Sequence, residues 1–134
     1  MNSRDTQKAN AGLSILVAED SIVHQTLAVR LLEGLGHAVT VVGNGKEAVR
    51  ALRRGMFDVL LTDVEMPELD GLSAARMIRA GEAEMGGRIP IVGVTTIGSH
   101  EDCLNAGMDA YLPKPLEAEP LTRTLKKVVR RTAA

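Results

Sequence analysis

Short apolar runs alternate with longer stretches of helical period along this chain. Five of the runs are compact and aliphatic, and they predict strands at residues 13–18, 38–42, 57–63, 89–95 and 109–113. Several are apolar at successive positions, as expected for strands that are covered on both faces. Strands and helices that alternate with right-handed crossovers predict a parallel sheet between two layers of helices.

Helical periodicity predicts five helices, one after each strand. We expect Gly36 to end the first, and Asn44 to begin the second with Glu47 as its capping-box partner. The third is expected to end within GEAEMGG, and a weaker fourth to run from about Ser99 to Ala106. The positions expected to face the core are Val23, Leu27, Leu31 and Leu35; Ala48, Val49 and Leu52; Leu72, Ala75 and Ile78; and Leu121, Leu125, Val128 and Val129.

The bulk composition narrows the classes of function. With 134 residues, of which 45% are hydrophobic and 25% charged, the chain matches one globular domain of ordinary size. Its net charge of −1 gives no global electrostatic basis for direct nucleic-acid binding, and no apolar stretch approaches the roughly 20 residues of a bilayer span. Residues 1–11 are polar and lack the apolar core of a signal peptide. We therefore expect a disordered tail or linker there, and a cytoplasmic location.

Polar residues gather where four of the predicted strands end. The carboxyl ends of parallel strands share one edge of the sheet, where such folds bind ligands. Carboxylates packed together repel unless a cation lies among them, and hard oxygen ligands suit Mg²⁺ better than a transition metal. A carboxylate beside Mg²⁺ is also a competent nucleophile toward phosphorus. The residues concerned are Glu19 and Asp20 after the first strand, Asp63 after the third, Thr95 and Thr96 after the fourth, and Lys114 after the fifth.

Several motifs together resemble the receiver domain of two-component response regulators. They are VAED, LLTDVEMPELDG, VTT and YLPKP, in this order and spacing, with further matches in GHAVTVVGNGKEAV and CLNAGMDAYLPKPL. The resemblance implies a doubly wound α/β fold over residues 12–131, with five parallel strands in the flavodoxin-like order 2-1-3-4-5 and five helices. The segment CLNAGMDAYLPKP is most similar to receivers of hybrid histidine kinases.

The same resemblance implies roles for individual residues. Asp63 would be the phosphoacceptor, with Mg²⁺ as cofactor and a phosphohistidine on a histidine kinase or histidine phosphotransfer domain as donor. Phosphorylation would switch the surface formed by the fourth helix, fifth strand and fifth helix. The other implied positions are Glu19, Asp20 and the backbone carbonyl of Glu65 as metal ligands beside Asp63, Lys114 as the family's site lysine, Thr95 as the switch hydroxyl, Tyr111 as the switch aromatic, and a cis Lys114–Pro115 bond.

Three positions are expected to tune this chemistry. Thr96 stands where the family commonly has alanine, and a threonine there would narrow access to the acceptor or add a hydroxyl near the phosphate. Glu65 and Ile97 each lie two places beyond a site residue, at positions that tune hydrolysis of the acyl phosphate in this family. Ile97 would shield Asp63 from water, whereas Glu65 would help to place an attacking water. The sequence leaves the phosphoryl lifetime open.

Other interpretations stand beside the receiver. A Mg²⁺-dependent phosphatase with an aspartyl nucleophile is the main alternative, because DVE resembles the spaced acids of haloacid-dehalogenase-like hydrolases. Those enzymes need a larger chain with a cap, so we do not expect an enzyme. Asp70 is expected to cap the third helix, His24 to be a solvated first-turn residue, and Cys103 to be a buried small residue. The cognate kinase, the downstream partner and the oligomeric state cannot be inferred from the sequence.

Overall fold

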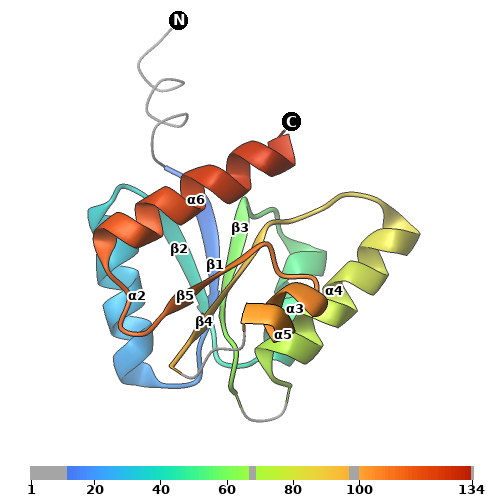
Figure 1. Ribbon diagram of the computed structural model, residues 1–134, viewed down its shortest axis with the longest axis horizontal. Helices are drawn as coiled ribbons and strands as arrows, with labels where there is room; N and C mark the ends of the chain where they lie inside the picture. Colours follow the sequence, from blue (N-terminus) through green and yellow to red (C-terminus); the bar gives the residue numbers. More distant parts are fainter. Residues whose placement is uncertain (1–11, 67–68, 97–99, 134) are drawn as a thin grey trace, which may run out of the picture.

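Five parallel strands form one sheet with helices on both faces in the part of the chain that the structure describes (Figure 1). The computed structural model describes residues 12–66, 69–96 and 100–133, so the tail predicted at residues 1–11 and the tuning residue Ile97 lie outside the described residues. The sheet order is β2-β1-β3-β4-β5, which confirms the predicted order. The strands are β1 (Ser14–Ala18), β2 (Ala38–Val42), β3 (Val59–Asp63), β4 (Ile91–Thr95) and β5 (Ala110–Pro113).

The helices lie in two layers. Helices α2 and α6 cover one face of the sheet, and α3, α4 and α5 cover the other (Figure 1). Each central strand therefore contributes buried side chains in both directions: Ile15 and Val17 of β1 pack in the α2 and α6 layer, and Leu16 packs in the opposite layer. This explains the unbroken apolar runs. The helices are α2 (Ile22–Gly34), α3 (Gly45–Arg54), α4 (Gly71–Met85), α5 (His100–Asn105) and α6 (Ala118–Ala133).

Side-chain caps begin three of these helices. Asn44 accepts a hydrogen bond from the Glu47 backbone N–H at 2.9 Å, which confirms the predicted capping of α3. The Asp70 side chain accepts the Ser73 N–H at 2.7 Å and caps α4, also as predicted. Helix α2 is capped by Ser21. The acids of the VAED motif are thus left for the strand-end cluster.

The predicted buried face of α2 is wrong in its first half. Val23 is 66% exposed and Leu27 is 55% exposed, whereas the buried residues of the helix are Ala28 and Leu32. Leu31 and Leu35 pack against the core only in part. Apolar residues occupy more of this helix than one face, so their spacing does not fix which side turns inward. Ala28 and Leu32 face the core, and the larger Val23 and Leu27 therefore lie at the surface.

The α4 helix ends at Met85, within the GEAEMGG segment where its end was predicted, and it runs through the interior Gly81. Arg79 on this helix donates to Glu82 Oε1 at 2.7 Å, and Glu82 Oε2 accepts the Ile89 N–H at 2.7 Å. Arg79 also donates to the Gly107 carbonyl and to Asp109 Oδ2, both at 2.8 Å. These side-chain contacts hold the last turns of α4 and tie them to the start of β5. A single interior glycine is therefore tolerated.

The His37 side chain carries a pH-dependent contribution to stability. Its Nδ1 accepts the backbone N–H of Leu13 at 3.1 Å, and burial lowers the pKa of the imidazole below the ordinary value of 6.5. As the pH falls, the unfolded chain therefore binds this proton before the folded chain does, so stability decreases below about pH 6.5 and this contribution is gone below the folded pKa. We expect urea unfolding of His37→Asn, which keeps an acceptor but cannot titrate, to depend less on pH between 7.5 and 5.5 than that of the wild type. Equal pH dependence would contradict this role.

Candidate functional site

Three carboxylates meet at the carboxyl edge of the sheet. Glu19 and Asp20 directly follow β1, and Asp63 ends the neighbouring β3. One oxygen from each carboxylate lies within 4.8 Å of the others, so this group can hold a metal ion. Glu19 and Asp63 are each only 5% exposed, whereas Asp20 is exposed. The predicted acid cluster is therefore a real juxtaposition, open to solvent on the Asp20 side.

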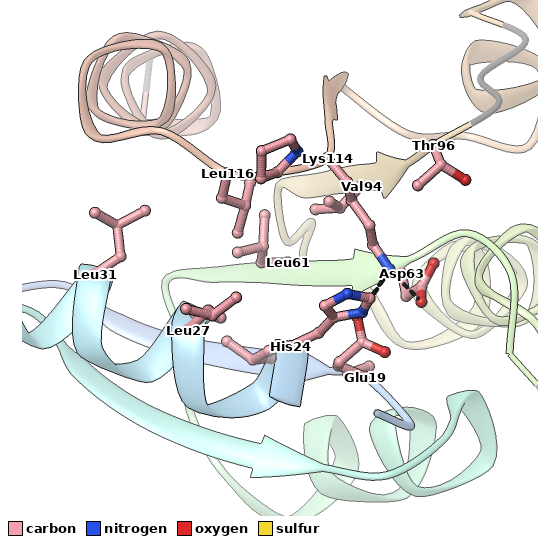
Figure 2. Close-up of a pocket in the computed structure, with 14 residues that line it drawn as sticks. Glu19, His24, Leu27, Leu31, Leu61, Asp63, Val94, Thr96, Lys114 and Leu116 are labelled. Carbon is pink, nitrogen blue, oxygen red and sulfur yellow. Dashed lines mark hydrogen bonds and ion pairs between the residues drawn. The ribbon is translucent and has the colours of Figure 1, made fainter. Parts of the chain in front are cut away.

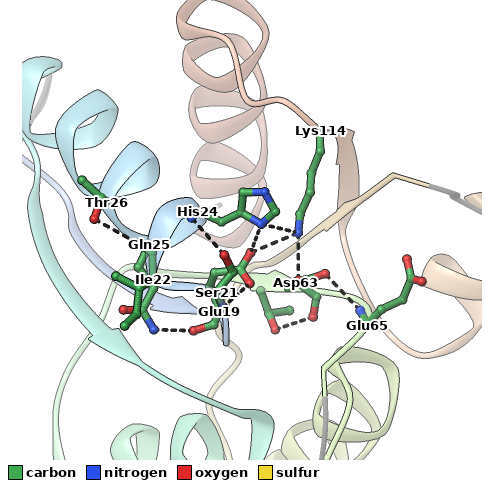
Figure 3. Close-up of polar contacts among 10 residues, drawn as sticks. Glu19, Ser21, Ile22, His24, Gln25, Thr26, Asp63, Glu65 and Lys114 are labelled. Atoms are coloured by element: carbon green, nitrogen blue, oxygen red, sulfur yellow. Dashed lines mark hydrogen bonds and ion pairs between the residues drawn. The ribbon is translucent and has the colours of Figure 1, made fainter.

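Lys114 reaches this cluster from the end of β5, an edge strand of the sheet. It directly follows β5, and its Nζ donates to Asp63 Oδ2 at 2.8 Å and to Glu19 Oε1 at 3.1 Å (Figure 3). The same nitrogen lies 3.3 Å from Nδ1 of His24, in the first turn of α2. The bond between Lys114 and Pro115 is cis, as the resemblance implied. One ammonium group thus neutralises part of the charge of two buried carboxylates.

The pKa values follow from this arrangement. Burial raises the pKa of the Glu19 carboxyl, and the charge of Asp63 adds to this rise. Hydrogen bonds from the Ser21 backbone and from Lys114 lower the pKa but offset the rise only in part. Burial would lower the pKa of Lys114, but hydrogen bonds and charges from Asp63 and Glu19 outweigh it and raise the pKa above 10.5. Lysine is therefore held protonated, while Glu19 pays a desolvation cost that a further cation would offset.

Both oxygens of Asp63 have a donor. Oδ1 accepts the backbone N–H of Glu65 at 3.0 Å, while Oδ2 binds Lys114. The Glu65 side chain is exposed and accepts a hydrogen bond from the buried Thr95 hydroxyl at 3.1 Å. The two residues predicted to act as tuning acid and switch hydroxyl therefore contact each other beside the acceptor. The predicted role of the Glu65 carbonyl as a metal ligand stays a prediction.

Tyr111 and Thr96 lie on different sides of the site. Tyr111, in register with Gly93 of β4, packs partly buried against the core under α3, α4 and α5. Thr96 is exposed and directly follows β4. It lines a cavity beside Asp63, as its predicted effect on access requires.

The cavity lies between α2 and the segment that joins β5 to α6 (Figure 2). Its volume is about 540 Å³, and most of its wall is aliphatic, with Leu27, Leu31 and Leu61 among the lining residues. Asp63 and Lys114 line the same space. A partner group that enters here would therefore meet an apolar wall and reach the acceptor carboxylate.

His24 is the site residue that sequence reasoning missed. Its side chain is 47% exposed, so the expected solvation holds in part, yet its ring contacts Lys114 and lies 3.6 Å from Glu19 Oε1. The signal in the sequence was its place in the first turn of the helix that follows the paired acids. That place puts the ring beside Glu19 only once α2 has docked against the sheet.

Comparison with known proteins decides the family. The model of the response regulator receiver domain matches residues 15–126, which is most of the chain. The chain belongs to this family. The receiver domain is 34% identical to a probable histidine kinase 1 of Oryza sativa subsp. indica and 38% identical to the hybrid signal transduction protein dokA of Dictyostelium discoideum, over 84% and 83% of its length. It spans only 15% and 7% of the lengths of these two relatives.

Two solved structures bear on the site. The receiver domain is 42% identical to that of a sensor histidine kinase from Pseudomonas aeruginosa, whose crystal structure has a magnesium ion coordinated in the active-site cleft; the TM-score is 0.80, with 90% of this chain and 99% of the other covered. The second is a co-crystal of the Saccharomyces cerevisiae histidine phosphotransfer protein Ypd1 with the receiver domain of Ssk1, at 25% identity and a TM-score of 0.83, covering 92% and 93% of the two chains. No helix in the described part of this receiver domain is long and apolar enough to cross a membrane.

The Lys114 ammonium contributes to stability through the carboxylates that it neutralises. Replacement by methionine leaves Glu19 and Asp63 buried without their shared cation. We expect Lys114→Met to lower the free energy of unfolding by roughly 2 kcal/mol in EDTA. We also expect Mg²⁺ to stabilise the variant in urea unfolding, because a bound cation would replace the lost charge. Lys126→Met, on the exposed face of α6, is the matched control and should change little. Equal stability of the two variants in EDTA would contradict the interpretation.

Proposed function

We propose that this receiver domain accepts a phosphoryl group on Asp63 from a phosphohistidine of a partner protein, as one step of a two-component phosphorelay. The observation that carries this is the placement of Asp63 among Glu19, Asp20 and Lys114, with a donor on each of its two oxygens. The carboxylate is buried but borders an open cavity, so a donor can reach it. Family membership and the carboxylate geometry support the same proposal.

The transfer is a displacement at phosphorus. An oxygen of Asp63 forms the new P–O bond while the N–P bond of the phosphohistidine breaks, and its electron pair returns to the imidazole. The Lys114 ammonium offsets negative charge on the phosphoryl oxygens as it does that of the carboxylates now. Glu19, Asp20 and Asp63 would hold the metal, with the Glu65 carbonyl as a proposed further ligand. When bound, Mg²⁺ supplies neutralisation and alignment of these oxygens.

The donor in this proposal is a histidine phosphotransfer domain or histidine kinase that docks on the exposed apolar start of α2. Ile22 and Val23 project into solvent there, and Leu27 continues the same surface into the cavity beside Asp63. Exposed aliphatic groups next to a reacting carboxylate suit a protein donor, because they exclude water while the phosphohistidine is presented. The likeness to a receiver crystallised with a histidine phosphotransfer protein supports this choice.

The product would change the surface beyond the site. A phosphoryl group adds negative charge and acceptor oxygens beside the Thr95 hydroxyl, which now donates to Glu65. Movement of Thr95 toward the phosphate would open space in the packing near Tyr111 and shift the population of conformations at α5, β5 and α6. The same proposal includes a cytoplasmic location and no steady enzymatic turnover. It also includes tuning of acyl-phosphate hydrolysis by Glu65, Thr96 and Ile97.

A mass measurement tests the proposed function. The protein is incubated with acetyl phosphate, or with a phosphorylated histidine phosphotransfer domain, in Mg²⁺ and separately in EDTA. We expect a gain of one phosphoryl group that requires the metal. Sustained release of phosphate from a small phosphomonoester, without accumulation of the phosphorylated protein, would favour the phosphatase alternative instead. No gain from either donor would contradict the proposal.

A further inference from the structure

The ammonium group of Lys114 has an acceptor for each of its protons. Lysine offers three donors and no acceptor. Among the described residues its partners are Asp63 Oδ2 at 2.8 Å, Glu19 Oε1 at 3.1 Å and His24 Nδ1 at 3.3 Å. These three atoms come from β3, from the residue after β1 and from α2, so they fix the ammonium from separate directions (Figure 3).

The contact with Lys114 is a hydrogen bond in one tautomer of the His24 ring. Because lysine can only donate, the ring nitrogen that faces it must present a lone pair, with the ring proton on Nε2. The alternative pairing of Nδ1–H with Glu19 is geometrically weaker, since the two atoms are 3.6 Å apart. In this tautomer the imidazole is an acceptor toward Lys114.

His24 differs from the other two acceptors in one respect. Glu19 and Asp63 both belong to the acid cluster that can hold a cation, so a bound cation competes with Lys114 for their oxygens. His24 lies outside that cluster. It is the acceptor that stays available to Lys114 when Glu19 is engaged elsewhere.

We infer that His24 is a positioning residue for phosphoryl transfer, which holds the Lys114 ammonium against Asp63 through its Nδ1 lone pair while the carboxylates bind the cation. This rests on the proposed function, because it concerns the alignment of Lys114 during that transfer. Loss of His24 leaves Lys114 in place at the end of β5, so it should misalign the ammonium group without removing it.

The test uses two substitutions of His24. Asparagine carries its side-chain oxygen on Cγ, where histidine carries Nδ1, so His24→Asn keeps an acceptor; His24→Leu removes it. Acetyl phosphate serves as donor at saturating Mg²⁺, which keeps partner docking out of the measurement. We expect His24→Leu to label on the order of tenfold more slowly than the wild type, and His24→Asn to stay within about twofold of it.

A spectroscopic readout separates positioning from general damage. With lysine side chains labelled with ¹⁵N, a fully hydrogen-bonded Lys114 ammonium should give a slowly exchanging signal, which Lys114→Arg identifies by its loss. We expect this signal in the wild type and in His24→Asn, and its loss by exchange broadening in His24→Leu, with equal urea midpoints for all three proteins. Wild-type labelling rate and signal in His24→Leu would overturn the inference and leave the proposed function intact. Equal slowing in both His24 variants would also overturn it, whereas a wild type that does not label would contradict the proposed function itself.

Discussion

Asp63→Asn is expected to abolish phosphoryl labelling from acetyl phosphate in the presence of Mg²⁺. The substitution keeps the size of the side chain but replaces a nucleophilic carboxylate oxygen by an amide, which also removes one charge from the acid cluster. We expect no detectable mass gain where the wild type gains one phosphoryl group, a loss of at least about a hundredfold in rate. Intact-protein mass spectrometry under neutral conditions measures this directly.

Asp70→Asn is the matched control for that loss. Asp70 undergoes the same chemical change a few residues further along, but its Oδ1 accepts the Ser73 N–H as the cap of α4, a role that asparagine fills equally well. We therefore expect this variant to label like the wild type and to unfold at a similar urea concentration. If labelling survived in Asp63→Asn and failed in Asp70→Asn, Asp70 would be the acceptor and the assignment to Asp63 would be refuted.

Gly71→Ala is expected to destabilise the domain strongly although it adds only one methyl group. Gly71 is the first residue of α4, and a Cβ there would overlap the backbone carbonyl oxygen of Asp63 and come within 3.0 Å of the Val64 Cα. These are backbone atoms, so relief requires a shift of α4 or of the strand end that carries the acceptor. We expect a loss of about 2–3 kcal/mol in the free energy of unfolding, measured in urea.

Gly81→Ala provides the comparison within the same helix. A Cβ on Gly81 would meet nothing within 4 Å, and its position in α4 is an ordinary helical one. The gain in helix propensity should therefore stabilise the domain by about 0.5–1 kcal/mol. Opposite signs for the two glycines would show that the close approach of α4 to the end of β3, and not helix propensity, controls the effect. A neutral Gly71→Ala variant would contradict that packing.

The close approach of Gly71 to Asp63 also links stability to chemistry. The carbonyl that Gly71 approaches belongs to Asp63, whose side chain is held by the Glu65 N–H and by Lys114. A shift of this backbone by a fraction of an ångström would move the carboxylate relative to both donors. We therefore expect the folded fraction of Gly71→Ala to label more slowly than the wild type, whereas Gly81→Ala labels normally.

Local sequence signals predicted the sheet and the acid cluster well. The strands are short buried runs whose identity depends on residues that are close in sequence, and their order followed from a resemblance that covers the domain. Glu19, Asp20 and Asp63 were predicted to meet because each follows or ends a parallel strand, and parallel strands share one carboxyl edge. Lys114 follows the same rule at the end of β5. The caps at Asn44 and Asp70 were equally local.

The rotation of α2 depends on tertiary packing. Apolar residues surround much of this helix, so the sequence allowed more than one buried face, and the close packing of Ala28 and Leu32 against the sheet selected one of them. That choice exposes Val23 and Leu27 and turns the His24 ring toward Lys114, 90 residues away in the chain. The approach of Gly71 to the Asp63 carbonyl depends in the same way on how α4 packs. The elements and the acids at the strand ends could be predicted from the sequence, because they follow from local pattern and strand direction. The contacts that align the site depend on packing between distant segments, which local pattern does not encode.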